Sequence, residues 1–498
     1  MTKFLYGAAV QGIQNFIFQT NRLREIVGAS ALVENICTEL FKNFIHDPDY
    51  DEHSIIHAAG NIKHVFESEE ICRRVVREFP KRVAEYAPGI TLSQAVVQFD
   101  DNTDFGNCAN ELEEKLRAQR NKPMPSITFS LMAMHRSRST NIPAIDYLSI
   151  VGKKMEYVDA ATLAKCFHVH NGIRGDRRNA LSLCKTAFGI PDLSYKQIAF
   201  DTEDITEQND WIAIIHADGN GLGRIVQKYG HNRTDLKTFS QDLDKNTKAA
   251  AVSAFEYIKE KYHWEIIPIR PIVLGGDDFT VICRADLALD YVRSFIEHFE
   301  RNNSKYNLTA CAGIAYVKSS YPFYYAYELA ENLCKYAKKD AKSFQDLPVS
   351  CVQMHKVQDS FVEDYASIIK RELEPTSDIN FAFGPYYVSA NQLPEARWTI
   401  AQLIEKASLL DCQEGNAVKS NLRQWLTLLY NGETEKADQK LNRMKELYRD
   451  NSNMRSLIDE VTKGANRHGT EGKDVLCYPI YDMLVQHTLN TQTTKTKE

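Results

Sequence analysis

The sequence lacks a long uninterrupted hydrophobic run, since none of its segments approaches the roughly eighteen consecutive apolar residues of a membrane-spanning helix. The amino terminus, MTKFLYGAAVQG, also lacks a basic segment followed by a long apolar one, which a signal peptide requires. These two absences argue against a membrane span and a secretory leader. We therefore expect a cytoplasmic protein without membrane contact.

Paired cysteine motifs, an excess of positive charge and a phosphate-binding loop are missing as well. The eleven cysteines include no CxxC pair and are odd in number, which favours reduced and mostly buried thiols. Lys and Arg total 60 against 66 Asp and Glu, so the net charge of −6 leaves nucleic-acid contacts to local basic patches. No GxxxxGK[ST] segment occurs, and this excludes a P-loop.

What is present is ordinary globular composition, with 43% hydrophobic, 25% charged and 10% aromatic residues among 498. A chain of this length predicts three or four packed units. We expect boundaries at 1–124, 125–200, 201–355 and 356–498.

The first unit shows the periodicities of strand, helix, hairpin, helix and strand, in that order. The expected elements are a strand at 4–10, an amphipathic segment continuing to 44, a hairpin turning at Gly60-Asn61, a helix at 67–85, a strand near 90–99 and a helix at 107–119.

The same order recurs later in the chain. The expected elements are the strand WIAIIHA, a helix at 235–262, a hairpin at 271–283 turning at Gly275-Gly276, a helix at 285–302, the strand LTACAGIAYV and a helix at 321–342. This order is the ferredoxin-like plan, an antiparallel sheet with helices on one face. The fold class is therefore α+β, with two diverged copies of one domain.

The remaining segments are less regular. Residues 125–200 are mixed, with basic runs at Arg136 and Arg138 and at Arg174, Arg177 and Arg178. From Asn391 onward the spacing of apolar residues is helical throughout, and this predicts a carboxy-terminal helical bundle.

The most informative motif is LGGDDF, at the tip of the second hairpin. Gly275 and Gly276 permit a tight turn that a ligand can approach closely, and Asp277 and Asp278 follow at once. The preceding strand ends in Asp218 of DGNGLG, and in this fold its end lies beside the hairpin tip. The spacing therefore predicts three converging carboxylates.

Converging carboxylates repel one another unless a cation lies between them, and oxygen ligands favour Mg²⁺ or Mn²⁺. Two such ions hold triphosphate oxygens and activate a hydroxyl in polymerases and cyclases. An isolated GGDD is often a surface turn, and GNGLG only weakly matches a dinucleotide-binding turn because a hairpin follows it.

A lysine row in ENLCKYAKKDAKSF follows the last strand of this unit. Lys335, Lys338, Lys339 and Lys342 share a helical face, which is often merely solvated. A bound triphosphate needs flanking cations, so we select Lys338 and Lys342 as nucleotide contacts.

Together GAAVQGIQNFIFQTNRLREIVGAS, HADGNGLG and LGGDDF resemble the large palm-domain subunit of type III CRISPR effector complexes, of Cmr or Csm type. The resemblance covers both palms and most of the chain. It implies an RNA-activated nucleotidyltransferase that joins ATP through 3′-5′ bonds, working with other effector subunits, guide RNA and target RNA.

Carried onto this sequence, the resemblance makes Asp218, Asp277 and Asp278 the catalytic metal ligands. It places Gly275 and Gly276 against the bound nucleotide, and we expect further nucleotide contacts from Gly219, Asn220, Gly221, Lys338 and Lys342 in the second palm and from Gly12, Gln14 and Gly60 in the first. The first palm reads HAAGNIKHV where the second reads LGGDDF. Without carboxylates at its tip, it is expected to bind an acceptor nucleotide.

Two departures from the family pattern are informative. Many members carry an amino-terminal HD nuclease domain, whereas His46-Asp47 stands in a loop, and we expect no nuclease role for it. Many also carry a zinc insertion between the palms, where this chain offers only Cys166, His168, His170 and Cys184. That spacing is poor for structural zinc, so we regard zinc there as a minor alternative.

Two alternative functions stay open, namely an inactive scaffold of the guide-RNA complex and a stand-alone GGDEF-like cyclase. The product also stays open, as a cyclic oligoadenylate or a conjugate of AMP with an adenosine-containing metabolite such as S-adenosylmethionine.

Overall fold

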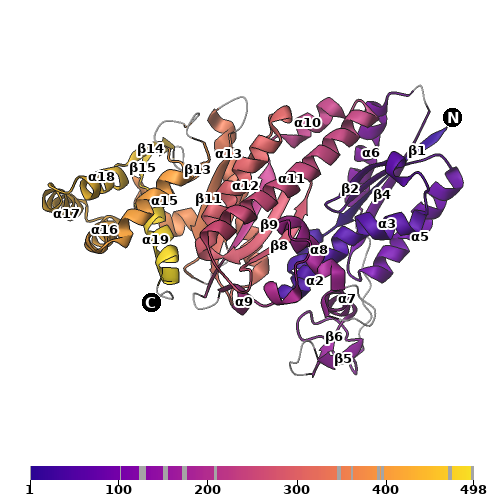
Figure 1. The fold of residues 1–498 in the computed structure, drawn as a ribbon, viewed down its shortest axis with the longest axis horizontal. Coiled ribbons are helices and arrows are strands. Elements are labelled where there is room, and N and C mark those ends of the chain that lie inside the picture. Colours follow the sequence, from indigo (N-terminus) through magenta and orange to yellow (C-terminus); the bar gives the residue numbers. More distant parts are fainter. Residues whose placement is uncertain are drawn as a thin grey trace.

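The computed structural model describes residues 2–100, 103–122, 131–149, 155–170, 177–206, 210–344, 349–359, 363–389, 393, 397–468 and 474–494. The molecule is elongated (Figure 1), with one sheet near the amino terminus, a larger sheet at the centre and a helical region at the far end. No helix in the described ranges is both long and apolar enough to cross a membrane.

The first sheet has the strand order β2-β3-β1-β4, which is the ferredoxin-like order. Its strands are β1 (Lys3–Gln11), β2 (Ser54–Ala58), β3 (Asn61–Phe66) and β4 (Thr91–Phe99), all paired antiparallel. Its helices are α1 (Ile13–Phe18), α2 (Leu23–Asn35), the π-helical turn η1 (Ile36–Leu40), α3 (Phe41–Ile45), α4 (Tyr50–His53), α5 (Glu69–Tyr86) and α6 (Phe105–Arg120).

The second sheet repeats this order as β8-β9-β7-β10 and adds β11 and β13 at one edge. Its strands are β7 (Trp211–Gly219), β8 (Ile269–Gly275), β9 (Asp278–Arg284), β10 (Ala310–Lys318), β11 (Cys351–Lys356) and β13 (Tyr386–Tyr387). Its helices are α10 (Leu222–Tyr229), α11 (Arg233–Lys261), η3 (Ala285–Leu287), α12 (Ala288–Asn302), η4 (Ser304–Tyr306) and α13 (Phe323–Phe344). The predicted duplication and α+β class are confirmed.

Helices cover both faces of each sheet, and this corrects the expectation of helices on one face. In the first unit, Leu112 of α6 packs with Leu5 and Val97, whereas Phe79 of α5 packs with Phe41 on the face of Tyr6. Adjacent residues of a strand point to opposite faces, so the apolar pair Leu5-Tyr6 requires cover on both sides. The unbroken apolar run of β7 has the same consequence in the second unit.

Both hairpin turns are displaced by one residue from their predicted positions. The first turn lies at Ala59-Gly60, because Ala59 itself adopts a positive φ of 50° and Asn61 already pairs with Ala58. The second turn lies at Gly276-Asp277, because Gly275 still pairs with Asp278.

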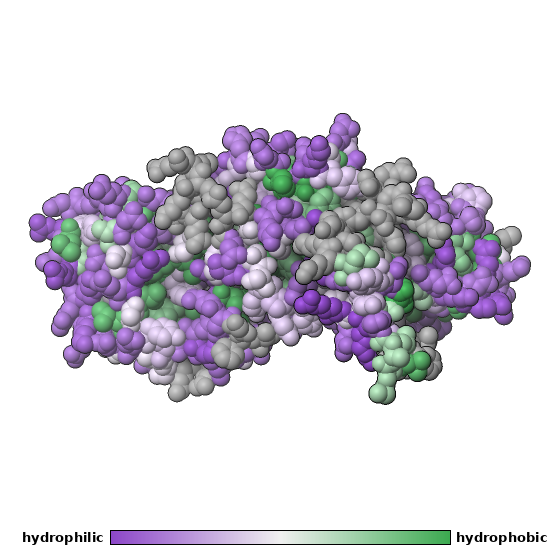
Figure 2. Space-filling view, turned by 90° about the horizontal axis from the view of Figure 1, so that it is seen from below, coloured by the Kyte–Doolittle hydropathy of each residue, from purple (hydrophilic) through white to green (hydrophobic). Residues whose placement is uncertain are grey.

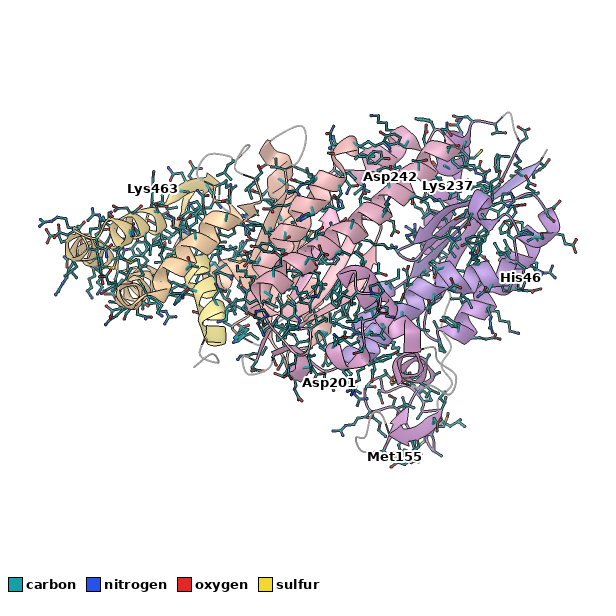
Figure 3. The ribbon with its side chains drawn as sticks, viewed as in Figure 1. His46, Met155, Asp201, Lys237, Asp242 and Lys463 are labelled. Carbon is teal, nitrogen blue, oxygen red and sulfur yellow. The ribbon has the colours of Figure 1, made fainter. Side chains whose placement is uncertain are left out.

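The segment between the sheets contains β5 (Asp146–Ser149), β6 (Met155–Val158), α7 (Ala160–His170), α8 (Arg177–Phe188), η2 (Tyr195–Gln197) and α9 (Thr202–Thr206). Strands β5 and β6 form a small projection from the body (Figure 1), whereas α8 packs against α11 and β8, and α9 packs against β7 and β9. Met155, labelled in Figure 3, lies at the outer end of this projection and is 48% exposed. The face seen in Figure 2 is mostly hydrophilic, with scattered hydrophobic patches.

The carboxy-terminal region is mainly helical, but the expectation of helix throughout from Asn391 is wrong. Strands β14 and β15 form an antiparallel hairpin, and β15 also pairs with β12. Short strands carry too few residues to show a period of two, which is why the pattern did not reveal them. The elements are α14 (Tyr365–Ile368), η5 (Ile369–Leu373), β12 (Ile379–Asn380), α15 (Ile400–Ser408), η6 (Leu409–Asp411), α16 (Gln413–Tyr430), α17 (Thr434–Leu447), α18 (Ser452–Val461), β14 (Ala465–His468), β15 (Asp474–Cys477) and α19 (Ile480–Thr494).

The cysteines are all free thiols, and every one except Cys412 is buried. The predicted burial of most thiols is therefore confirmed.

Candidate active site

The GGDD turn is hydrogen-bonded to the long helix α11. Thr247 of α11 donates a hydrogen bond from its hydroxyl to the carbonyl oxygen of Gly276 at 2.6 Å. Gly276 has a φ of 62°, and a Cβ atom at this position would meet nothing within 4 Å. The turn is therefore fixed on one side, while the main chain at Gly276 stays open to a ligand on the other.

The three predicted carboxylates converge at this turn. Asp218 stands at the end of β7, beside Cys311 of β10, and its carboxyl shares a hydrogen bond with that of Asp277. Asp278 is the first residue of β9, and its Oδ1 lies 3.5 Å from both His216 Nδ1 and Thr280 Oγ1. The tight turn thus brings two consecutive aspartates to one site.

The negative charges of the three carboxylates repel one another. Burial and the neighbouring Asp218 carboxylate raise the pKa of Asp277 to about 8. Burial and the same carboxylate raise the pKa of Asp278 to about 7. Asp218 behaves differently: burial disfavours its charge, but hydrogen bonds from Asp277 and Lys338 hold its pKa below the ordinary value.

Lys338 is the cation that meets this acidic cluster. Its ammonium donates to Asp218 Oδ2 at 2.5 Å and to the carbonyl oxygen of Gly219 at 2.8 Å. Lys342, one turn farther along α13, is exposed, and Lys335 pairs instead with Glu331 at 2.8 Å. Of the two selected lysines, the structure brings Lys338 onto the carboxylates.

Residues 219–221, which follow Asp218, contribute backbone rather than side chains to the site. A Cβ atom at Gly219 would lie 2.2 Å from Leu222 Cδ1 and 3.1 Å from Asp277 Cβ, so only glycine fits beside that aspartate. Asn220 turns inward, where its amide donates to Thr309 Oγ1 at 3.0 Å. Gly221 precedes α10 with a φ of 70°.

The two hairpin tips face each other across the domain boundary. A Cβ atom at Gly275 would lie 3.6 Å from the backbone nitrogen of Ala59, in the first turn. Gly60 has a φ of 77°, and a Cβ atom there would lie 2.4 Å from Ile13 Cδ1. Gly12 precedes α1 with a φ of 67°, as Gly221 precedes α10. The predicted equivalence of the two units thus extends to the backbone of these turns.

A contact between the two sheets passes through Gln14 and Tyr327. Gln14 of α1 donates from its side-chain amide to the Tyr327 hydroxyl of α13 at 2.9 Å. The Tyr327 ring stacks on Phe18, with centroids 4.3 Å apart, and lies edge-on to His216 at 5.5 Å. His216 in turn faces Asp278, so a residue of the first unit is linked to the carboxylate site.

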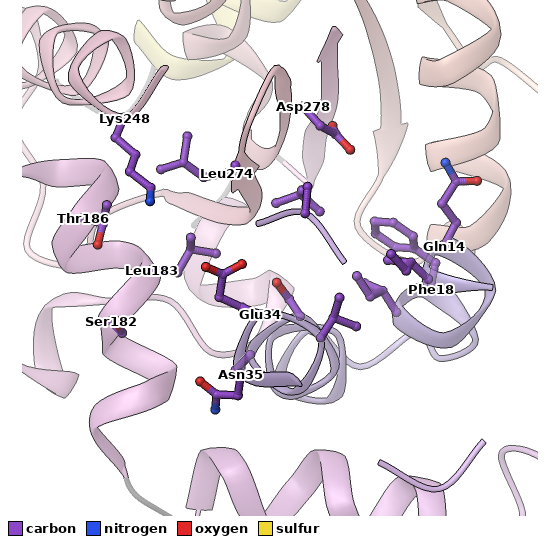
Figure 4. A pocket seen from close by; sticks show the side chains of 18 of the residues that line it. Gln14, Phe18, Glu34, Asn35, Ser182, Leu183, Thr186, Lys248, Leu274 and Asp278 are labelled. Atoms are coloured by element: carbon purple, nitrogen blue, oxygen red, sulfur yellow. The ribbon is translucent and has the colours of Figure 1, made fainter. Parts of the chain in front are cut away.

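A cavity of about 140 Å³ opens where the two units meet (Figure 4). Asp278 and Gln14 lie on one side of it, and Glu34 and Lys248 point toward it from opposite elements (Figure 4). Its polar and apolar lining comes from both units and from α8 between them, including Ser30, Asn35, Ala59, Ser182, Thr186, Leu274 and Gly275.

Several residues of this site were not identified from the sequence. His216 precedes Asp218 by two residues on the same strand face, so the period of two could have identified it. Lys248, Glu34 and Tyr327 come from helices, and helical periodicity does not show which helices meet.

The residues present fit the expected divalent ions. Three carboxylates converge, and two of them have pKa values raised by burial and by a neighbouring carboxylate, which an added cation would reverse. An all-oxygen donor set of this kind is typical of Mg²⁺ or Mn²⁺.

The four residues between the sheets that were weighed as a minor zinc alternative are only partly described. Cys166 and Cys184 are buried, and burial raises the pKa of the Cys166 thiol to about 12. The side chains of His168 and His170 lie outside the described residues, as do those of Arg174, Arg177 and Arg178. Arg136 and Arg138 are exposed, as a contact with RNA would require.

Two facing palm-type units, of which one carries an acidic turn, define a double-palm protein. Residues 211–344 match the family model of Cas10/Cmr2, second palm domain. This match over the second palm confirms the resemblance inferred from the motifs. A search of the curated proteins found no match.

Solved structures with a similar fold extend this comparison over the whole chain. A Csm1-Csm4 cassette in complex with pppApApA matches with a TM-score of 0.57 and 13% identity, over 98% of this chain and 69% of that chain. A Csm1-Csm4 cassette in complex with cA4 matches with a TM-score of 0.52 and 14% identity, over 99% and 69%. Csm1 in T. onnurineus matches with a TM-score of 0.50 and 15% identity, over 98% and 69%.

Proposed function

We propose that this chain is the nucleotidyltransferase subunit of a type III CRISPR effector complex and makes an adenylate second messenger from ATP by forming 3′-5′ bonds. The observation that carries the proposal is the convergence of Asp218, Asp277 and Asp278 beside a cavity that both palms line. The family match of the second palm supports it, as do the pppApApA and cA4 ligands of Csm1-Csm4 cassettes with this fold.

Asp218, Asp277 and Asp278 would hold two Mg²⁺ or Mn²⁺ ions, which supply phosphate neutralisation and activation of the attacking hydroxyl when bound. Gly275 and Gly276 leave the main chain bare, so that a triphosphate can lie directly against the turn. Lys338 now neutralises Asp218, and its ammonium is placed to contact a phosphate oxygen once cations take over that carboxylate.

The first palm would bind the second nucleotide. Gln14 lines the cavity opposite Asp278 (Figure 4), and the tip at Ala59 approaches Gly275. The first palm tip has no carboxylate, so it would hold and orient an acceptor without adding a metal ligand. Holding two reactants together in this way removes much of the entropic barrier to their reaction.

The proposed partners are the other effector subunits, with guide RNA and target RNA bound through the complex. Solved chains of this fold occur in a Csm1-Csm4 subcomplex of a type III-A CRISPR-Csm interference complex. The chain's negative charge is consistent with RNA held largely by partner subunits.

The product is tested by supplying ATP to the assembled complex with target RNA, with and without S-adenosylmethionine, and identifying the products by mass spectrometry. Cyclic oligoadenylate in both reactions identifies a cyclase, whereas an AMP conjugate formed only with the second substrate identifies a conjugating enzyme. Absence of any ATP-derived product in both reactions would contradict the proposed function and favour a scaffold.

A further inference from the structure

A second cluster of ligand-type side chains lies in the first palm, away from the GGDD turn. Asp47 Oδ2 is 2.7 Å from His53 Nδ1 and 3.0 Å from His64 Nε2. The three candidate ligand atoms all lie within 4.8 Å of one another. The cluster thus unites Asp47 with His53 from the following helix and His64 from the sheet, rather than with the adjacent His46.

The local backbone explains how these three residues meet. Helix α3 ends at His46, whose φ of 51° turns the chain so that Asp47 enters the loop before α4. Oδ1 of Asp47 accepts a hydrogen bond from the Asp49 backbone at 3.0 Å, which leaves Oδ2 for the histidines. His53 closes α4, and His64 is paired with Tyr6 in the sheet.

The surroundings of the cluster are aromatic and nearly closed to water. The His64 side chain is fully buried, with its ring centroid 4.7 Å from that of Phe66 and 5.6 Å from that of Phe41. Asp47 and His53 are 14% and 16% exposed, so one side of the cluster is reachable from solvent.

The ring nitrogens of both histidines point at one oxygen atom. His53 Nδ1 and His64 Nε2 each lie within hydrogen-bond distance of Asp47 Oδ2. Two imidazole nitrogens and a carboxylate oxygen that meet at one point are also the donor set that surrounds a small divalent cation.

We propose that Asp47, His53 and His64 bind one Zn²⁺ ion. Zinc takes imidazole nitrogens and carboxylate oxygens in a tetrahedron, with ligand atoms roughly 3.3 Å apart when the bonds are about 2.0–2.1 Å. The two oxygen–nitrogen distances, 2.7 and 3.0 Å, would therefore lengthen on binding by about 0.6 and 0.3 Å, and a water can take the fourth position on the exposed side. The nitrogen donors distinguish this site from the all-oxygen GGDD site.

The ion would stabilise the segment of the first palm that contacts helix α11. Arg233 of α11 donates to the carbonyl oxygen of Glu52 at 2.7 Å, and Lys237 donates to that of Asp51. Figure 3 places Lys237 where α11 meets the first palm. The loop that carries Asp47 and His53 leads directly into β2, whose tip at Ala59 faces the GGDD turn.

The test is the zinc content of the purified full-length chain, measured by mass spectrometry in buffer with excess Mg²⁺ to occupy oxygen sites. The wild type should retain about one zinc per chain. His53→Gln and Asp47→Asn should lose it, whereas His46→Gln, an exposed neighbour outside the cluster, should retain it. A wild-type chain without zinc, even after incubation with the ion, would overturn the proposal.

Two further arms keep the result interpretable if a variant folds poorly. Co²⁺ added to the metal-free wild type should give the visible absorption of tetrahedral cobalt, and a spectrum without it would count against the site. Cys166→Ala and Cys184→Ala should keep their zinc. Loss of zinc in these cysteine variants, with retention in His53→Gln, would place the metal between the palms and overturn the proposal.

Discussion

At the residue scale, the three aspartates at the GGDD turn have different electrostatic states although they share one site. Asp218 is stabilised as a carboxylate by Lys338, whereas Asp277 and Asp278 retain protons to higher pH because their partial burial and the Asp218 carboxylate disfavour their charged forms. A divalent cation would remove this difference by favouring the charged form of all three.

Replacing Asp218 with asparagine should therefore reduce product formation by more than tenfold, a loss above about 1.4 kcal/mol of transition-state stabilisation. The measurement is the initial rate of ATP conversion by the assembled complex. Asp235→Asn, an exposed aspartate in the first turn of α11, is the matched control and should leave the rate unchanged. A rate within tenfold of wild type would make Asp218 a turn residue.

The pH dependence of stability should also reveal the carboxylates. Because the pKa of Asp277 is raised to about 8 in the folded protein, the folded state binds more protons than the unfolded state between about pH 4 and 8. The free energy of unfolding of the metal-free chain should thus fall across this window as pH rises. Thermal or denaturant unfolding at several pH values measures this.

Two comparisons isolate the cause of that pH effect. Added Mg²⁺ should flatten the decline, because the cation favours the charged carboxylates, and Asp277→Asn should flatten it without Mg²⁺. A decline of equal slope in Asp277→Asn would assign the pH dependence to other groups.

At the element scale, the turn after β7 must stay free of side chains. Gly219→Ala would bring a methyl group against Asp277 and Leu222, whereas Gly223→Ala, four residues later, meets nothing within 4 Å. We expect Gly219→Ala to lose most activity and Gly223→Ala to retain it. Comparable activity in the two variants would show that Asp277 tolerates displacement.

The link between the palms can be tested with Tyr327→Phe, which removes the hydroxyl that accepts from Gln14 but keeps the ring that stacks on Phe18. Loss of one such hydrogen bond typically costs about 0.5–1.5 kcal/mol. We expect a small decrease in the free energy of unfolding and a decrease in activity, which Gln14→Ala should share. Additive effects in the double variant would indicate that the two side chains act separately.

The elements of the two palms were predictable because the hydrophobic periodicity within a long segment indicates its secondary structure without knowledge of the rest of the fold. β7 is an unbroken apolar run, and LGGDDF marks a turn by composition alone. The turn positions were wrong by one residue, since the positive φ of Ala59 has no signal in a residue type that rarely adopts it. Strand β11 was missed because its pairing with β10 is non-local.

The carboxylates of the site were likewise predictable, but most of the cavity was not. Asp218, Asp277 and Asp278 follow from motifs at strand ends. Lys248 and Glu34 meet only because α11 and α2 face the same cavity, which no local pattern encodes. Similarly, Asp47 was noted as part of an HD dipeptide, but its partners His53 and His64 required the fold.

At the scale of the whole molecule, the double palm places the half that carries the GGDD turn against a half whose hairpin tip has no carboxylate. With a net charge of −6, the chain should bind RNA weakly by itself near physiological salt. We expect RNA binding and ATP turnover to appear together when the other effector subunits, guide and target RNA are added. Tight RNA binding and full turnover by the lone chain would instead indicate a self-contained RNA-sensing synthase.

The most direct test of the central claim is ATP conversion by the assembled complex, with and without target RNA, for the wild type and for Asp277→Asn/Asp278→Asn. Mass spectrometry should detect a 3′-5′ linked adenylate product only for the wild type with target RNA, while both complexes bind RNA equally. The same product at the same rate from the double variant would contradict the assignment of this site.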